Sequence, residues 1–213
     1  TCALPIFKET YGFQKAYGSY EKLLADPKVE AVYIPLPNTM HYEWTIRALK
    51  SGKHVLCEKP LAPTEAQAEE MFKAAEENHV YLMEAFAYQH SPYIAAVRKE
   101  IENGTIGDVR YMESAYITSD YDPKNIRMRR DTLGGCTYDL GVYNTSLILR
   151  ILGDEPAKVR AIASFSEEKI DTLTSAIFEY ADGKKAAFSC GMALATDLDR
   201  HIDRFVFGVK HIK

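Results

Sequence analysis

Apolar and polar residues follow each other along the first part of the chain in a pattern that predicts short strands alternating with amphipathic helices. Nearly continuous apolar runs at residues 29–37, 54–57 and 80–86 are typical of strands in a parallel sheet that is covered on both faces. Between these runs, residues 41–50 and 64–77 carry apolar side chains at helical spacing. The alternation with short loops predicts a doubly wound parallel sheet.

The pattern changes after residue 86. The predicted order is a helix at 92–103, a strand at 108–118, a helix at 134–152 and strands at 157–165, 172–180 and 184–192. The last two strands are separated by the turn sequence Ala181-Asp-Gly-Lys, which indicates an antiparallel hairpin. We therefore predict two domains, residues 1–86 and 87–213, and since no low-complexity linker separates them we expect them to pack around a ligand-binding cleft.

Composition and charge narrow the classes of function. The chain has 213 residues, is 46% hydrophobic and 26% charged, and carries a formal net charge of −4, so it can bury a core and is a poor match for nucleic acid or an anionic membrane. The sequence has no apolar run near the roughly 18 residues that cross a bilayer and no signal peptide at its start, which predicts a cytoplasmic protein.

Cysteine and histidine spacing gives no sign of a metal site. The four cysteines, Cys2, Cys57, Cys136 and Cys190, have no C-x-x-C pair, and free thiols are expected. The histidines lack the i, i+4 spacing of ligands, and no serine lies in a G-x-S-x-G sequence, so we predict neither a metal nor a nucleophilic serine.

Two loops at the ends of predicted parallel strands could carry chemistry. Glu58-Lys59-Pro60 follows the strand at 54–57, and the loop from Pro37 through Asn38 to His41 follows the strand at 29–37. Ligands bind at this edge of open α/β sheets. The competing interpretations are that Lys59 is an ordinary solvated lysine and that Asn38 only caps the next helix.

A third candidate is the helix that begins with Gly134-Gly135. Its Asp139 and Tyr143 are four residues apart, which places both on one face of a regular α-helix. In the competing interpretation, Asp139 interacts only with the helix dipole and Tyr143 is a core residue with its hydroxyl at the surface.

These motifs occur together in one order along the chain. The strand Val32-Tyr-Ile-Pro-Leu-Pro-Asn-Thr-Met-His41 is followed by Ala48-Leu-Lys-Ser-Gly-Lys-His-Val-Leu-Cys-Glu-Lys-Pro-Leu61, Leu82-Met-Glu-Ala-Phe86 and Gly134-Gly-(x)3-Asp-x-Gly-x-Tyr143. Together they closely resemble the Gfo/Idh/MocA oxidoreductases, over nearly the whole chain. Tyr143 and the sequence Met83-Glu-Ala-Phe-Ala-Tyr88 are similar to the branch with glucose-fructose oxidoreductase, dimeric dihydrodiol dehydrogenase and NADP-linked xylose dehydrogenase.

The resemblance implies a Rossmann domain followed by an α+β domain with an open, mostly antiparallel sheet. It also implies hydride transfer between NADP or NAD and a sugar, cyclitol or trans-diol. The implied residues are Lys59, Tyr143 and Asp139 for catalysis, Pro37, Asn38, His41, Glu58, Lys59 and Pro60 for the cofactor, and Tyr88, His90 and Arg129 for the substrate. A tyrosine with an ordinary pKa near 10 acts as acid or base at neutral pH only beside a cation, and Lys59 is that cation by hypothesis.

One part of the family pattern does not occur in this sequence. The family's first strand and its G-x-G-x-x-G turn would precede Lys15, and no such glycine motif is present, so we expect the first domain to be partial and the isolated chain to be inactive. The second domain is expected to be partial too, because residues 203–211 resemble a family strand after which more sheet follows. A non-catalytic dinucleotide-binding regulator and an inactive fragment therefore stay open beside the enzyme. Family members associate through the C-terminal sheet, which implies a homodimer or homotetramer.

Overall fold

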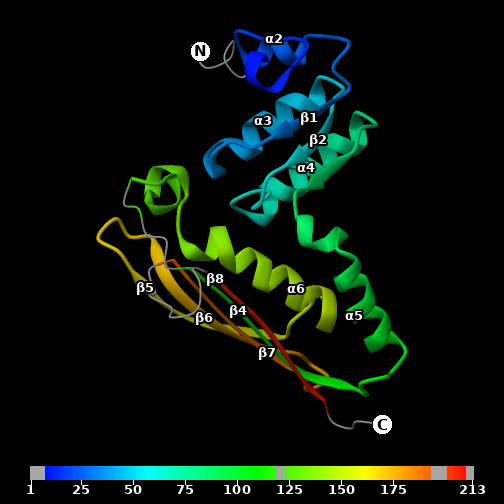
Figure 1. Ribbon diagram of the computed structural model, residues 1–213, viewed down its shortest axis with the longest axis vertical. Helices are drawn as coiled ribbons and strands as arrows, with labels where there is room; N and C mark the ends of the chain where they lie inside the picture. The colour runs from blue at the N-terminus through cyan, green and yellow to red at the C-terminus, as the bar shows by residue number, and fades with distance from the viewer. Residues whose placement is uncertain (1–7, 119–121, 123, 193–200, 210–213) are drawn as a thin grey trace. The chain divides into compact units, whose positions relative to one another are not determined.

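The chain forms two compact units, each with its own sheet and core (Figure 1). The computed structural model describes residues 8–118, 122 and 124–192, and the backbone of residues 201–209. The first unit comprises Thr1–Leu36 and Met40–Ala85, and the second comprises Pro37–Thr39 and Phe86–Lys213. Cys2 and residues 193–200, which follow the last predicted strand, lie outside the described residues.

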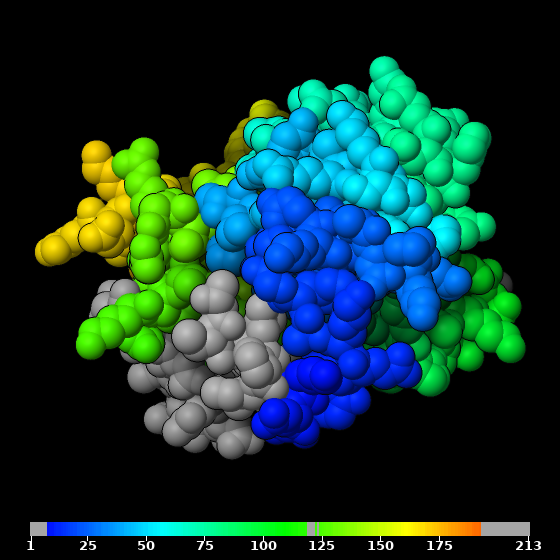
Figure 2. Space-filling model, turned by 90° about the horizontal axis from the view of Figure 1, so that it is seen from above, coloured from blue at the N-terminus to red at the C-terminus, as the bar shows by residue number. Residues whose placement is uncertain are grey.

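The first unit is a three-stranded parallel sheet with helices between its strands. Its elements are α2 (Tyr20–Leu24), β1 (Ala31–Ile34), α3 (Asn38–Lys50), β2 (His54–Cys57), α4 (Glu65–Glu77) and β3 (Leu82–Glu84). The strands pair in the order β1-β2-β3, all parallel, which confirms the predicted sheet. Apolar residues of β1, β2, α3 and α4 form its buried core, and the blue to cyan surface in Figure 2 belongs to this unit.

The strands of this sheet are shorter than the apolar runs predicted. β1 begins at Ala31 because the amide of Val29 bonds to the carbonyl of Asp26 in a turn, and it ends before Pro35, which has no amide hydrogen to donate. The run at 80–86 yields only Leu82–Glu84, since the amide of Val80 bonds to Ala75 at the end of α4. α3 is longer than predicted, because it begins at Asn38 directly after Pro37.

The second unit is a five-stranded mixed sheet with helices. Its elements are η1 (Ala87–His90), α5 (Pro92–Glu102), β4 (Val109–Thr118), η2 (Ile126–Met128), η3 (Arg130–Thr132), the π-helical turn η4 (Thr137–Gly141), α6 (Val142–Leu152), β5 (Lys158–Phe165), β6 (Asp171–Glu179), β7 (Lys185–Gly191) and β8 (His201–Val209). The strand order is β5-β6-β7-β4-β8. Of the four strand pairs among the described residues, β4 and β7 run parallel and the other three run antiparallel, so the prediction of a mostly antiparallel sheet is confirmed.

The two faces of this sheet differ. Helix α6 lies across one face (Figure 1), where Leu147 and Ile148 join a buried cluster with apolar residues of β4, β6 and β7. On β6, residues alternate between this core and the opposite face, which carries Ile177. Ile162 of β5 lies on the same opposite face, because it pairs with Ser175, which is two residues from Ile177 on β6, and Ile162 is 78% exposed. One face of the sheet is therefore covered and the other presents apolar side chains.

Neither unit contains, among the residues that the structure describes, a helix that is long and apolar enough to cross a membrane.

Candidate functional site

The carboxyl ends of β1, β2 and β3 meet at one edge of the parallel sheet, as the pairing register requires. Lys59 follows β2 at this edge, and its side chain is partly exposed. Lys59 thus lies at the edge where parallel α/β sheets bind ligands.

His41 supports this edge from its buried side. Its side chain is fully buried, Nδ1 lies 2.8 Å from the carbonyl oxygen of Pro60, and Nε2 lies 2.7 Å from the carbonyl oxygen of Leu36. The imidazole therefore connects the loop after β1 with the turn that carries Lys59. With no exposed surface, His41 holds these two loops in place and does not present its ring to solvent.

Glu84, at the end of β3, holds the same turn from its other side. Its Oε1 accepts a hydrogen bond of 2.8 Å from the amide of Leu61. Burial raises the pKa of Glu84 above its ordinary value, although the bond from Leu61 and the positive charge of Lys59 act in the opposite direction. The backbone on the carboxyl side of Lys59 is thus fixed by two side chains, the buried His41 of α3 and the partly buried Glu84 of β3.

The other cofactor-binding candidates are placed as follows. Glu58 accepts a 2.5 Å hydrogen bond from the hydroxyl of Tyr33, and this bond, together with burial, raises the pKa of Tyr33 to about 12. Asn38 begins α3, and its side-chain amide donates to the carbonyl of Leu133 at 2.8 Å within the second unit, to which residues 37–39 belong. Pro37 ends the loop after β1 and is partly exposed.

Asp139 and Tyr143 lie at the start of the helix that packs on the second sheet. The prediction of one regular α-helix over residues 134–152 is wrong at its beginning, because residues 137–141 form a wider π-helical turn and α6 begins only at Val142. Such turns occur frequently at functional sites. The carboxylate of Asp139 in this turn lies 2.9 Å from Nε of Arg127.

Aromatic rings surround Tyr143. Its ring centroid lies 5.5 Å from that of Phe86, 5.6 Å from that of Tyr116 and 6.2 Å from that of Tyr88. The hydroxyl of Tyr88 in turn shares a 2.7 Å hydrogen bond with Oγ of Ser146 on α6. The structure therefore brings together Tyr143 and one predicted substrate residue, Tyr88, in a cluster of four rings.

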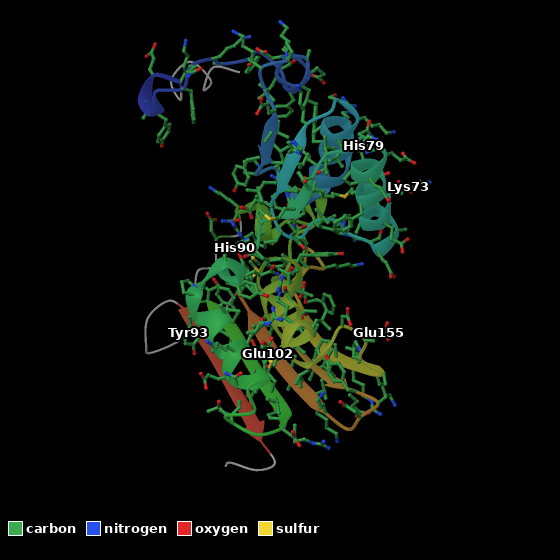
Figure 3. The ribbon with its side chains drawn as sticks, turned by 90° about the vertical axis from the view of Figure 1, so that its right-hand side faces the viewer. Lys73, His79, His90, Tyr93, Glu102 and Glu155 are labelled. Atoms are coloured by element: carbon green, nitrogen blue, oxygen red, sulfur yellow. The ribbon has the colours of Figure 1, made fainter. Side chains whose placement is uncertain are left out.

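Two other predicted substrate residues lie outside this ring cluster. His90 is exposed and precedes the first turn of α5, where Figure 3 shows it near Tyr93. Arg129 is exposed and pairs with Asp131 through two side-chain contacts. Arg129 lines an open hollow of about 660 Å³ together with Met128, Arg130, Asp131 and Glu168.

Several residues at these two places were missed by the sequence analysis. They are Glu84, Phe86, Tyr116, Arg127 and Asp171, whose Oδ2 accepts a hydrogen bond from the amide of Thr137 in the π-helical turn. Phe86 and Glu84 lay inside a predicted strand, where a core position was the simplest interpretation. Arg127 lay in a short basic stretch without any recognisable spacing to Asp139, and Asp171 had the appearance of an ordinary polar residue at the start of a strand. Only folding brings these residues to the candidate groups.

Within the part of the chain that the structure describes, no group of three or more His, Cys, Asp or Glu side chains is arranged to hold a metal ion. The described cysteines, Cys57, Cys136 and Cys190, are buried free thiols.

Known proteins resemble this chain in sequence and in fold. An uncharacterized oxidoreductase of Rhizobium meliloti is 37% identical over 87% of this chain and 56% of its own length. The trans-1,2-dihydrobenzene-1,2-diol dehydrogenase of Mus musculus is 34% identical over 88% of this chain and 56% of its own length. A solved 3-ketoreductase from Actinomadura kijaniata, in complex with NADP and TDP-benzene, matches with a TM-score of 0.87 and 31% identity over 97% of this chain and 62% of its own.

Two family models match consecutive parts of the chain. The model of the oxidoreductase family with an NAD-binding Rossmann fold matches residues 3–86, and the model of the GFO/IDH/MocA C-terminal domain matches residues 94–206. The chain spans a little over half the length of the curated relatives that it matches. Both family models and these relatives show that the chain belongs to the Gfo/Idh/MocA family of oxidoreductases.

Proposed function

We propose that this protein is an NAD(P)-dependent oxidoreductase that acts on a CH–OH group of a sugar, cyclitol or trans-diol, or on the corresponding carbonyl. The observation that carries the proposal is the presence of two residues, Lys59 on the carboxyl edge of the Rossmann-type sheet of the first unit and Tyr143 at the start of α6 in the second unit. Structures of the Actinomadura kijaniata 3-ketoreductase include variants that replace one lysine and one tyrosine, and those two positions are 84 residues apart, as Lys59 and Tyr143 are. Equal spacing in chains of one fold supports an equivalent pair.

The carboxyl edge of the first unit fits the nicotinamide end of a dinucleotide in its chemistry. It offers a partly exposed cation at Lys59, on a turn whose backbone is fixed by His41 and Glu84. We propose Pro37, Asn38, His41, Glu58, Lys59 and Pro60 as the residues on this side, with His41 acting through the backbone of Pro60. The cofactor, NADP or NAD, supplies the carbon that exchanges a hydride with the substrate.

In the proposed reaction, Tyr143 takes the proton of the substrate hydroxyl during oxidation and returns it during reduction. Lys59 stabilises the negative charge that develops on the oxygen. Asp139 orients the substrate or the lysine, and its ion pair with Arg127 holds its carboxylate in one direction. The charge on Asp139 is thereby balanced without a contribution from the substrate.

For the substrate, the ring cluster around Tyr143 favours a molecule with an apolar face. Tyr88 and Tyr116 are partly exposed and offer flat surfaces, and the ring faces of sugars and of cyclic diols fit such surfaces. His90 and Arg129 remain proposed substrate residues, although both are exposed and outside the ring cluster.

The test is turnover in the full-length protein. It uses NADPH and NADH with 3-keto sugar nucleotides, and NADP+ and NAD+ with aldoses, cyclitols and trans-diols, and follows the absorbance of the reduced nicotinamide. We expect turnover with at least one substrate. Cofactor binding without turnover on any of them would contradict the proposal and favour a regulatory role, and absence of both would favour an inactive chain.

We also propose that the protein forms a homo-oligomer through the open face of the second sheet. The support is the exposure of Ile162 and Ile177 on this face, because exposed apolar patches of this kind commonly mark interfaces. We expect Ile162→Asp to shift the sedimentation coefficient toward the monomer. Ile126→Asp, at an exposed position of η2 away from the sheet, is the matched control and leaves the assembly unchanged. An oligomer that tolerates Ile162→Asp would contradict this interface.

A further inference from the structure

Asp171 is the first residue of β6, far along the chain from the proposed catalytic groups, yet its side chain lies at the start of their helix. Its Oδ2 accepts hydrogen bonds from the amide of Thr137 at 2.8 Å, the hydroxyl of Thr137 at 2.5 Å and the hydroxyl of Thr174 at 2.8 Å. The thiol of Cys136 also donates to it, with 3.0 Å between sulfur and oxygen. One carboxylate oxygen thus collects four donors.

The helix needs this acceptor. The first amides of a helix have no partner within the helix, and a side chain at the N-cap usually supplies one. Here the residue before the π-helical turn is Cys136, which makes no capping hydrogen bond. Asp171 therefore replaces the missing local cap from a neighbouring strand, and its negative charge favours the positive end of the helix dipole.

The two glycines before the helix leave the space that this contact needs, because neither has a Cβ atom. Gly135 has a φ of +117°, and a Cβ atom on it would lie only 2.1 Å from Oδ1 of Asp171. A Cβ on Gly134 would lie 2.2 Å from the carbonyl oxygen of Arg127, the residue whose side chain pairs with Asp139. The pair of glycines, which the sequence offered as part of a family motif, is thus explained by close packing against Asp171 and Arg127.

The charge state of Asp171 agrees with this role. Burial alone would raise the pKa of its carboxyl group, but the hydrogen bonds from Thr137, Cys136 and Thr174 outweigh burial, so the pKa lies below its ordinary value. Asp171 therefore carries its negative charge at neutral pH.

We propose that Asp171 is a positioning residue that sets the π-helical turn and, through it, the places of Asp139 and Tyr143. The proposal rests on the proposed function, since it assigns Asp171 a part in the reaction through these two residues. Asp139 is two residues beyond Thr137 and Tyr143 is six residues beyond it, so a shift of Thr137 moves both groups. Displacement of a catalytic group by about 1 Å can cost on the order of 100-fold in rate.

The test compares Asp171→Asn with Thr174→Val in the full-length protein. Asparagine keeps the shape of the side chain but loses the charge, whereas Thr174→Val removes one donor to the same carboxylate and leaves the bond to the helix amide in place. For Asp171→Asn we expect a loss of about 10- to 100-fold in kcat, little change in KM for the cofactor, and a shift in the limb of the pH profile that belongs to Tyr143. Thr174→Val leaves that limb where it is.

A purely structural role would lower the fraction of active protein without moving the pH profile, so an unmoved limb in Asp171→Asn would overturn the proposal. Amide hydrogen exchange separates this outcome from a failure of the proposed function, because it needs no substrate. We expect residues 137–143 to exchange at least about 10-fold faster in Asp171→Asn than in Thr174→Val. Equal exchange in the two variants would refute the positioning role, whatever reaction the protein catalyses.

Discussion

Glu84 and Asp171 are two partly buried carboxyl groups, one in each unit, that accept hydrogen bonds from the backbone near a proposed catalytic group. Burial is the largest influence on both and acts to raise the pKa of each. The pKa of Glu84 is raised accordingly, but that of Asp171 is lowered in spite of burial. The difference lies in the donors, since Glu84 accepts from the amide of Leu61 and Asp171 accepts from an amide, two hydroxyls and a thiol.

The two halves of the proposed site, one in each unit, are held by different forces. The turn with Lys59 is held by a buried imidazole and a carboxyl group that burial pushes toward its neutral form. The start of the helix with Tyr143 is held by a full negative charge at a helix N-terminus. Substitutions and changes of pH should therefore affect the two halves unequally.

The largest expected effect is on the helix half. Tyr143→Phe removes the proposed acid/base and should lower turnover by roughly 10²- to 10⁴-fold while cofactor affinity, assigned to the other unit, stays the same. Steady-state kinetics and a cofactor titration in the full-length protein measure both. Tyr111→Phe removes a hydroxyl that bonds only weakly to Glu113, at 3.5 Å, and serves as the matched control. Turnover of Tyr143→Phe equal to that of Tyr111→Phe would contradict the role of Tyr143.

The second prediction concerns the backbone against which Asp171 packs. Gly135 and Gly153 have nearly equal φ angles, +117° and +115°, but a Cβ on Gly153 would meet no atom within 4 Å. Gly135→Ala should therefore cost about 3–5 kcal/mol of unfolding free energy, from strain and overlap together, and Gly153→Ala only about 1–2 kcal/mol from strain. Urea unfolding of the two variants measures the difference. Equal losses would show that Asp171 moves aside at no cost.

On the strand side, the third prediction tests the connection made by His41. His41→Ala leaves the carbonyl oxygens of Leu36 and Pro60 without the imidazole and opens a cavity, so it should cost about 2–4 kcal/mol of unfolding free energy. The exposed His90→Ala should change it by no more than about 0.5 kcal/mol. If His41→Ala were as stable as His90→Ala, the imidazole would not hold the turn of Lys59.

Much of the fold was predictable because it follows from local pattern. The run predicted at residues 54–57 forms the strand His54–Cys57, and the helix predicted at residues 64–77 forms at Glu65–Glu77 with Thr64 as its N-cap. The parallel pairing of β4 with β7 was not predictable in this way. It joins segments more than 60 residues apart, and no local signal in either strand records its partner.

The candidate site was predictable only in its ionisable and aromatic members. Lys59 stands out in the sequence because it directly follows a predicted strand, and Asp139 and Tyr143 stand out because they are four residues apart in a predicted helix. The π-helical turn that carries Asp139 does not, because it depends on Asp171, which reaches Thr137 from a strand 34 residues along the chain. Residues that act by holding the backbone of others leave no periodicity or spacing to detect.

The smallest expected effect is on the pH dependence of stability, which tests the difference between Glu84 and Asp171 directly. The lowered pKa of Asp171 means that its charge stabilises the fold above the ordinary value of 3.8, and that this contribution is lost as the pH falls below that value. The raised pKa of Glu84 means the reverse. Above 4.5 the unfolded chain releases the proton that the folded chain retains, so stability falls as the pH rises toward the pKa of the folded state.

Asp171→Asn should accordingly cost about 1–3 kcal/mol at pH 7, and the loss should shrink below pH 4, whereas Glu84→Gln should be neutral or stabilising by up to about 1 kcal/mol at pH 7. Glutamine can still accept from the amide of Leu61, which makes Glu84→Gln a test of charge alone. Urea unfolding of both variants and the parent between pH 3 and pH 7 measures the two slopes. Slopes of the same sign would mean that the number of donors does not decide which carboxyl group keeps its charge, and the two halves of the site would then be held in the same way.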